Sequence, residues 1–135
     1  NEVTGLPEAG WRTRFTSRAM VKLGQLAINK GQWNGEQLIP EAFIAKATNR
    51  IVDTNDDEIF FVGENVFNSG YGYYFWQADM KYGDKTYFTT SAQGGGGQYI
   101  ILIEELDLIV VTTAHERGAK AMQITAERIL PAFVK

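Results

Sequence analysis

Apolar residues recur at helical spacing near the start of the chain, after a short turn-rich segment. Thr16 or Ser17 offers a helix N-cap. The apolar positions that follow on one face are Ala19, Met20, Leu23, Leu26 and Ala27. Polar side chains occupy the opposite face, so we expect a half-buried helix that ends at Lys30 and Gly31. A second, shorter helix is predicted from Pro40 to about Asn49.

The middle and the end of the chain have the character of strands. Residues 71–76 and 87–90 are aromatic and β-branched, with a turn at 81–84 between them. Residues 99–103 and 108–113 are two apolar runs joined by the short polar loop 104–107, which predicts a hairpin. Both runs are apolar at successive positions rather than at alternate ones. We therefore expect both faces of this sheet to be covered.

A final apolar stripe predicts a C-terminal helix from about Gly118, with Pro131 interrupting it. The stripe consists of Ala119, Met122, Ala126, Ile129, Leu130 and Phe133. The order is then helix, helix, three or four antiparallel strands, helix. This order predicts an α+β fold with an antiparallel sheet and helices on both faces, in a single domain over residues 1–135.

Composition excludes several classes of function. The net charge is −3 and Lys and Arg do not cluster, which disfavours nucleic acid as a partner. No apolar run is long enough for a membrane span. The chain has no cysteine, and His115 is its one histidine, so we expect no metal site and no cofactor. The acidic residues at 53 and 56–58 lack the spacing of a calcium loop, and we interpret them as a solvated loop.

Four consecutive glycines, Gly94–Gly97, lie between two predicted strands. Glycine is placed in strands where a bulge, a positive φ or the close approach of another group requires it. A phosphate-binding loop is excluded because Gln98 and a strand follow rather than a lysine and a helix. Neither G-x-S-x-G nor S-x-x-K occurs in the chain. The pattern by itself predicts a sheet edge opened by glycine beside a cleft, and a plain β-bulge remains the alternative.

Five segments in order resemble a known family. The segment TSRAMVKLGQL (16–26) looks like T-x-R-D-M-A-K-F-G, and GQWNGEQLIPE (31–41) like G-x-W-x-G-x-x-L-[IL]-[PS]-E. The segments YGYYFW (71–76), GGGGQYI (94–100) and LDLIVV (106–111) resemble Y-G-Y-x-W-W, G-x-G-G-Q-Y-[IL] and x-D-L-V-V-V. Together they resemble the C-terminal half of the class C β-lactamase-like serine hydrolases, a superfamily of penicillin-binding proteins, esterases and the 6-aminohexanoate-dimer hydrolase.

The resemblance implies a β-lactamase/transpeptidase-like fold with a serine nucleophile from an S-x-x-K motif in an N-terminal half. This half would supply the active-site strand, with its K-T-G or H-T-G triplet at Ala92, Gln93 and Gly94. The backbone N–H of Gly95 would be one oxyanion-hole donor. Gly96 and His115 would line the substrate cleft. Because Ala92 replaces the Lys or His that binds a β-lactam carboxylate, the resemblance favours an esterase or amidase.

The chain is then expected to be a C-terminal fragment of a larger periplasmic or secreted hydrolase, inactive alone. Its expected partners are the N-terminal half of the same parent protein and a small ester or amide substrate. An exposed sheet edge predicts that the fragment also forms a homo-oligomer. The alternative is a non-catalytic binding module that uses the same edge.

Overall fold

The structure is a computed structural model that describes residue 5 and residues 13–56, 63–115 and 120–134. Two helices, α1 (Ser17–Ile28) and α2 (Glu41–Thr48), precede a six-stranded antiparallel sheet in the order β3-β4-β5-β6-β7-β8. The strands are β3 (Val52–Asp53), β4 (Val66–Gly72), β5 (Phe75–Tyr82), β6 (Lys85–Gly94), β7 (Gln98–Ile103) and β8 (Leu108–Thr112). A two-stranded ribbon, β1 (Gln32–Trp33) and β2 (Glu36–Gln37), lies between the helices.

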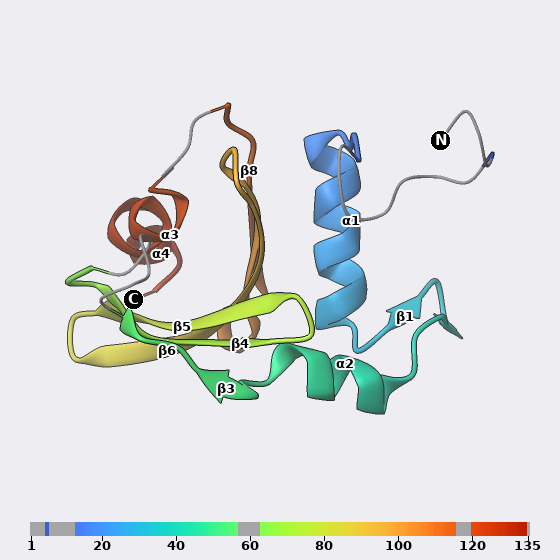
Figure 1. Cartoon of the computed structure of the whole chain (residues 1–135), viewed down its shortest axis with the longest axis horizontal. Helices are drawn as coiled ribbons and strands as arrows, with labels where there is room; N and C mark the ends of the chain where they lie inside the picture. Colours follow the sequence, from blue (N-terminus) through green and yellow to red (C-terminus); the bar gives the residue numbers. More distant parts are fainter. Residues whose placement is uncertain (1–4, 6–12, 57–62, 116–119, 135) are drawn as a thin grey trace.

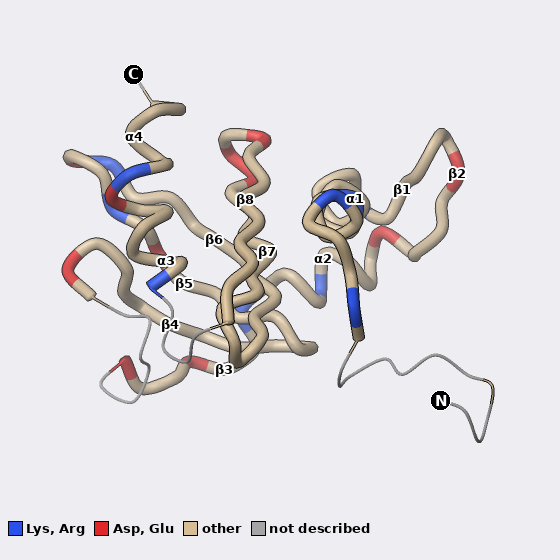
Figure 2. Tube along the Cα trace, turned by 90° about the horizontal axis from the view of Figure 1, so that it is seen from above, with Lys and Arg blue, Asp and Glu red and all other residues tan. Residues whose placement is uncertain are grey.

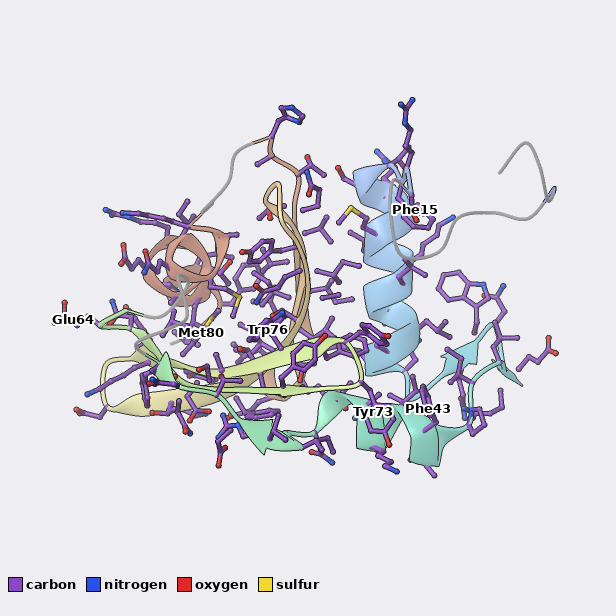
Figure 3. The ribbon with its side chains drawn as sticks, viewed as in Figure 1. Phe15, Phe43, Glu64, Tyr73, Trp76 and Met80 are labelled. Atoms are coloured by element: carbon purple, nitrogen blue, oxygen red, sulfur yellow. The ribbon has the colours of Figure 1, made fainter. Side chains whose placement is uncertain are left out.

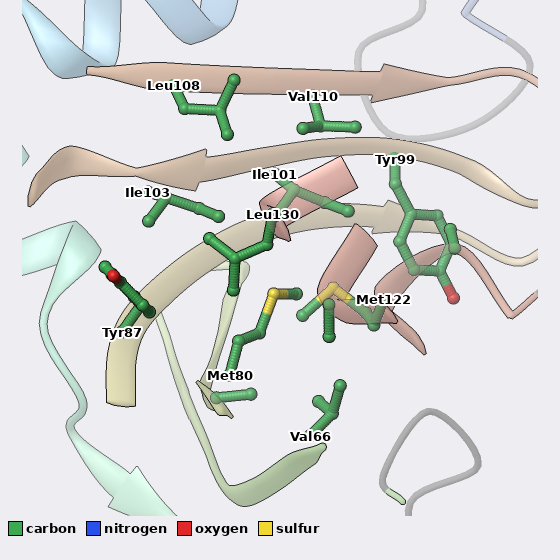
Figure 4. Close-up of a cluster of buried hydrophobic side chains, with 13 residues drawn as sticks. Val66, Met80, Tyr87, Tyr99, Ile101, Ile103, Leu108, Val110, Met122 and Leu130 are labelled. Carbon is green, nitrogen blue, oxygen red and sulfur yellow. The ribbon is translucent and has the colours of Figure 1, made fainter. Parts of the chain in front are cut away.

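Helices cover both faces of the sheet, as the apolar runs predicted (Figure 1). α1 lies against β7 and β8, where a side chain on Gly24 would meet Ile109 at 2.8 Å and Ile100 at 3.1 Å. The C-terminal helical segment covers the other face, and Met122 and Leu130 are fully buried there (Figure 4). Its partners alternate along the strands, which is the period of two that places every second side chain on one face. They are Val66, Ala78, Met80, Tyr87, Tyr99, Ile101, Ile103, Leu108 and Val110.

The C-terminal segment is a helix interrupted one turn before its proline. It consists of α3 (Ala121–Ile124), a π-helical turn (Thr125–Ile129) and α4 (Leu130–Phe133), in which Pro131 is in the first turn. Proline has no N–H to donate and clashes with the carbonyl of the preceding turn, so a wider turn there accommodates it. The predicted start at Gly118 and the side chain of Ala119 lie outside the described residues. Phe133 was expected in the buried stripe but is exposed.

The sheet has more strands than the three or four that the sequence predicts. β3 and β4 fall within 52–72, most of which the sequence pattern does not resolve into elements. Asp56 was interpreted as part of a solvated loop, and it does lie in the connection between β3 and β4 and is partly exposed, but it also has a structural role that the sequence did not predict. Its carboxylate accepts hydrogen bonds from the backbone N–H groups of Asn68 and Ser69, both at 2.7 Å, and from the Ser69 hydroxyl. Asp57 and Glu58 lie outside the described part of the chain.

Asp56 fixes an irregularity in β4. The register between β4 and β5 shifts between Phe67 and Gly70, and Asn68 there has a φ of 54°. A β-bulge of this kind leaves backbone groups without a ladder partner. The Asp56 carboxylate supplies that partner. Burial alone would raise its pKa, but the hydrogen bonds from Ser69 and Asn68 outweigh this and lower the pKa of Asp56 below its ordinary value.

Candidate functional site

The end of β6 is paired on one edge only. β5 pairs with β6 from Tyr82↔Lys85 up to Trp76↔Ser91, and there the pairing stops. The next three residues of β6, Ala92–Gly94, pair with β7 on the other side, up to Gly94↔Gln98. Within the described residues, the edge of β6 that faces β5 therefore has no strand partner beyond Ser91. In Figure 1 the β4–β5 hairpin runs across the view, whereas β7 and β8 rise beside α1, so the two hairpins diverge at this point.

The glycine run forms the tight turn between β6 and β7. The N–H of Gly97 donates to the carbonyl of Gly94 at 3.0 Å, and Gly97 has a φ of 89°. Gly95 and Gly96 do not have positive φ, so the turn has the pattern of a type I turn followed by one left-handed residue. The Gly94 carbonyl thus points toward β7. The N–H and C=O groups of successive residues in a strand point to its two edges in turn, so those of Gln93 point toward the unpaired edge. The N–H of Gly95 belongs to the same peptide group as the Gly94 carbonyl and points in the opposite direction, so it also points toward the unpaired edge.

Three of the four glycines have a reason within the fold. Gly97 needs the left-handed region, where other residues are strained. A side chain on Gly96 would meet the Gln98 amide at 2.8 Å, and one on Gly94 would meet it at 3.0 Å. Gln98 itself is fixed there because its Nε2 donates to the Ala114 carbonyl at 2.6 Å. Gly95 differs from the other three: it is exposed, and a Cβ there would have nothing within 4 Å.

The N–H of Gly95 donates to no carbonyl or side chain of the described residues. A backbone donor at an exposed turn, without a side chain to shield it, can reach an external acceptor at hydrogen-bonding distance. Of the expected substrate-lining positions, Ala92 and Gln93 are half-buried, and Gln93 donates to the Ser91 hydroxyl at 2.8 Å. His115 is exposed and follows Ala114, whose carbonyl Gln98 binds, so it also lies at this end of the sheet.

The strands that form this end of the sheet carry no charged side chain over most of their length. No Asp, Glu, Lys or Arg occurs between residues 66 and 78 or between 86 and 103, and the strands β6 and β7 accordingly lack colour over most of their length in Figure 2. The Tyr99 ring is 1% exposed and is paired across from Gln93. Burial raises the pKa of Tyr99, so the phenol stays protonated at neutral pH and does not serve as a base there.

None of the three serines is placed as an activated nucleophile. Ser91 is fully buried and accepts a hydrogen bond from Gln93. Ser69 is 1% exposed and holds the Asp56 bulge. Ser17 begins α1 on the exposed surface. Among the described residues, no group of three metal-ligating side chains comes together, and no helix is both long and apolar enough to cross a membrane.

One feature of this end was not predicted from the sequence. The β4–β5 turn consists of Tyr73 and Tyr74, with φ values of 47° and 71°. Two-residue hairpin turns of this type favour Asn-Gly or Asp-Gly, so two tyrosines gave no turn signal and the run 71–76 was interpreted as one strand. The pairing Gly72↔Phe75 shows the turn directly. The local sign of this turn in the sequence was the pair of glycines just before it, in Gly70-Tyr71 and Gly72-Tyr73.

The chain is similar in fold to a solved structure. The structure is that of a Bacillus anthracis protein named as a 6-aminohexanoate-dimer hydrolase, with a TM-score of 0.54 and 19% sequence identity over 89% of this chain. This chain spans about 30% of the length of that protein. No protein-family model matches the sequence, and no curated protein matches it either. The described fold is therefore an α+β fold consistent with the C-terminal part of a β-lactamase-like fold, as the sequence motifs predicted.

Proposed function

We propose that this chain is the C-terminal portion of a β-lactamase-like serine hydrolase that cleaves an ester or amide through an acyl-enzyme. In this proposal β6 is the active-site strand, and the serine nucleophile comes from an S-x-x-K motif in an N-terminal half of the same parent protein. The chain alone is then inactive. The ordered sequence motifs and the likeness in fold to the Bacillus anthracis protein support this assignment.

The observation that carries the proposal is the exposed N–H of Gly95. Acyl transfer develops negative charge on the carbonyl oxygen, and backbone N–H groups aimed at that oxygen stabilise the tetrahedral intermediate. Gly95 is the one glycine of the turn for which the described fold supplies neither a steric nor a conformational reason. The absent side chain lets an acyl group approach the amide. The unpaired edge of Ala92–Gly94 adds further backbone donors and acceptors beside it.

The absence of charged side chains from residues 86–103, which cover β7 and all of β6 except Lys85, favours a substrate without a carboxylate at this position. Ala92 stands where the β-lactamases that the chain resembles have Lys or His, and no charged side chain lies between residues 86 and 103. A buried or half-buried carboxylate without a cationic partner costs several kcal/mol, on the order of the desolvation of one ion. We therefore propose a small neutral ester or amide rather than a β-lactam. Gly96 and His115 complete the mouth of the cleft in this proposal.

The N-terminal half would pair with β8. This strand (Leu108–Thr112) ends the sheet, and its sequence LIVVT has no charge, no proline and no bulge in its pairing with β7. Natural sheets protect an exposed terminal strand with charged residues, proline or a bulge, or cover it with another element. Because β8 has none of the first three, we propose that another strand covers it. The opposite terminal strand, β3, is only two residues long and carries Asp53. A further strand on β8 would extend the sheet.

We also propose a periplasmic or secreted location for the whole protein.

A proline at position 95 tests the role of the amide. Proline is favoured at the second position of a type I turn and lacks the N–H, so Gly95→Pro removes the donor while it suits the turn. Gly95→Ala keeps the N–H and has open space for its methyl group, which makes it the matched control. In the full-length protein we expect Gly95→Pro to lower kcat for p-nitrophenyl acetate by roughly 10²- to 10³-fold. Gly95→Ala should retain most of the activity.

Labelling with a fluorophosphonate probe tests the rest of the proposal. We expect the full-length protein to be labelled at a serine outside residues 1–135, and the isolated chain to stay unlabelled. Labelling of Ser17, Ser69 or Ser91 would refute the assignment. Equal activity of the proline and alanine variants would show that Gly95 supplies no donor. An unlabelled, inactive full-length protein would favour a non-catalytic binding module that uses the same edge.

A further inference from the structure

The last residues of β6 are held by β7 and β8 rather than by β5. Trp76 of β5 pairs with Ser91, and the pairing between these two strands stops there. In Figure 3 the turn between β6 and β7 lies beyond the labelled Trp76 and away from Phe43 of α2. The position of the Gly95 amide therefore depends on the contacts of this turn with β7 and with the end of β8.

Two side chains join this turn to the end of β8, one in each direction. The regular pairing of β7 with β8 ends at Tyr99↔Thr112. Beyond that pair, the Gln98 Nε2 donates a hydrogen bond to the Ala114 carbonyl at 2.6 Å. The Thr112 hydroxyl donates to the Gly97 carbonyl at 3.0 Å. These two bonds, the side-chain clamp, join the turn to the end of β8 where the backbone pairing has stopped.

The Gln98 amide also packs on both neighbours of Gly95. A Cβ on Gly94 would lie 3.0 Å from the Gln98 Oε1, and one on Gly96 would lie 2.8 Å from the Nε2. Both glycines therefore leave the space that the amide occupies, and the amide restricts the backbone on either side of Gly95. A Cβ on Gly95 itself would have nothing within 4 Å. The side-chain clamp thus holds the flanks of the turn and leaves its middle open.

An oxyanion-hole donor has to be correctly directed as well as exposed. The stabilisation that a backbone N–H gives requires a distance of about 2.7–3.1 Å between the donor and the developing oxyanion. A displacement of about 1 Å, caused by a change outside the reacting groups, can lower the rate by about 10²-fold. Glycine has the widest conformational freedom of any residue, so a run of four glycines does not by itself fix the direction of its amides. Contacts from outside the run have to fix it, and the side-chain clamp supplies them.

We propose that Gln98 is a positioning residue that keeps the Gly95 N–H directed at the oxyanion, through its bond to the end of β8 and its packing on the turn. Thr112 acts with it from the neighbouring strand. The inference rests on the proposed hydrolase function and adds how the turn of its active-site strand is held in place. Because the oxyanion forms only in the transition state, a misdirected donor should lower kcat and leave KM nearly unchanged.

Gln98→Met tests this role in the full-length protein, because methionine keeps the length of the side chain and removes its N–H donors. We expect kcat for p-nitrophenyl acetate to fall by roughly 10-fold, with KM within about 2-fold of the wild-type value. Thr112→Val, which keeps the shape of the side chain and removes the hydroxyl, should lower kcat in the same way. Gln25→Ala is the matched control: it removes a glutamine amide that donates to Asn29 at 3.0 Å on α1, and it should change neither constant.

A double-mutant cycle with Gly95→Pro separates positioning of the donor from a merely structural role. The donor is already absent in Gly95→Pro, so adding Gln98→Met to it should lower kcat by less than about 2-fold. Equal effects of Gln98→Met in the wild-type and Gly95→Pro backgrounds would overturn the inference. If Gln98→Met does not fold, as judged by thermal unfolding, Thr112→Val gives the same cycle and the same two outcomes.

The outcomes also separate this inference from the proposed function. A loss of kcat in Gly95→Pro, together with unchanged kcat in Gln98→Met and Thr112→Val, would overturn the inference alone. A full-length protein that is inactive and resists the fluorophosphonate would overturn the proposed function and this inference together.

Discussion

Replacing Asp56 with Asn should destabilise the protein in a way that depends on pH. The carboxylate accepts three hydrogen bonds, from the N–H groups of Asn68 and Ser69 and from the Ser69 hydroxyl. Asparagine has one acceptor oxygen and presents an NH₂ group in place of the other. In Asp56→Asn at least one donor at the bulge of β4 therefore loses its partner, and Ser69 is only 1% exposed to water.

The magnitude follows from the kind of bond that is lost. A hydrogen bond to a charged group contributes about 1.5–3 kcal/mol, and a buried donor without a partner costs about 1–3 kcal/mol. Asp56 itself is partly exposed, which reduces the electrostatic share. We expect a loss of about 2–3 kcal/mol in the free energy of unfolding at pH 7. This is a large fraction of the roughly 5–15 kcal/mol that holds a domain folded.

The sign of the pH dependence follows from the direction of the shift. Burial alone would raise the pKa of Asp56, but the hydrogen bonds lower it in the folded protein below the ordinary aspartate value of 3.8. A carboxyl group with a lowered folded pKa stabilises the protein above the unfolded pKa, and this contribution disappears as pH falls through the folded pKa. The difference in unfolding free energy between the wild type and Asp56→Asn should therefore have its maximum value at pH 7 and become smaller below about pH 4.

Urea unfolding followed by tryptophan fluorescence, in steps from pH 7 to pH 3, measures this difference. The control is Asp53→Asn, in the same segment. Asp53 is 84% exposed and lies 3.8 Å from Arg50, so its loss should cost no more than about 0.5 kcal/mol. A difference for Asp56→Asn that stays constant or grows as pH falls would refute the reasoning. Equal effects of the two substitutions would refute it as well.

Two further predictions concern packing and the exposed edge. Gly24→Val should destabilise the fold by about 1–3 kcal/mol in thermal unfolding, because its side chain would collide with Ile109 and Ile100, whereas Val21→Ala on the exposed side of α1 should be nearly neutral. A neutral Gly24→Val would mean that α1 does not pack closely on the sheet. The isolated chain should form a homo-oligomer through the edge of β8, visible as a mass in light scattering that rises with concentration. A monomer that persists at high concentration would contradict this.

The helices and the central strands were predictable because their signals are local. α1 begins at Ser17 with Thr16 as its N-cap, as the sequence predicted, and Thr16 accepts from the Ala19 N–H at 3.2 Å. The apolar runs that became β7 and β8 predicted a sheet covered on both faces, and helices cover both faces. Leu23 was expected on the buried face of α1 but is exposed, because the neighbouring position, Gly24, is the one that faces Ile109 and Ile100 of the sheet.

The remaining features depend on contacts between residues that are far apart in the chain. Asp56 looked like one acidic residue of a loop, and only its hydrogen bonds to residues twelve and thirteen positions later give it a role. The sequence by itself placed the glycine run between two strands, because four glycines interrupt any packed element. Which of those glycines the fold requires was decided by the tertiary structure, through Gln98 at Gly94 and Gly96 and through the φ of Gly97. The tertiary structure also determines that the edge of β6 beside Gly95 is unpaired, because the residue at which β5 separates from β6 depends on the twist of the whole sheet.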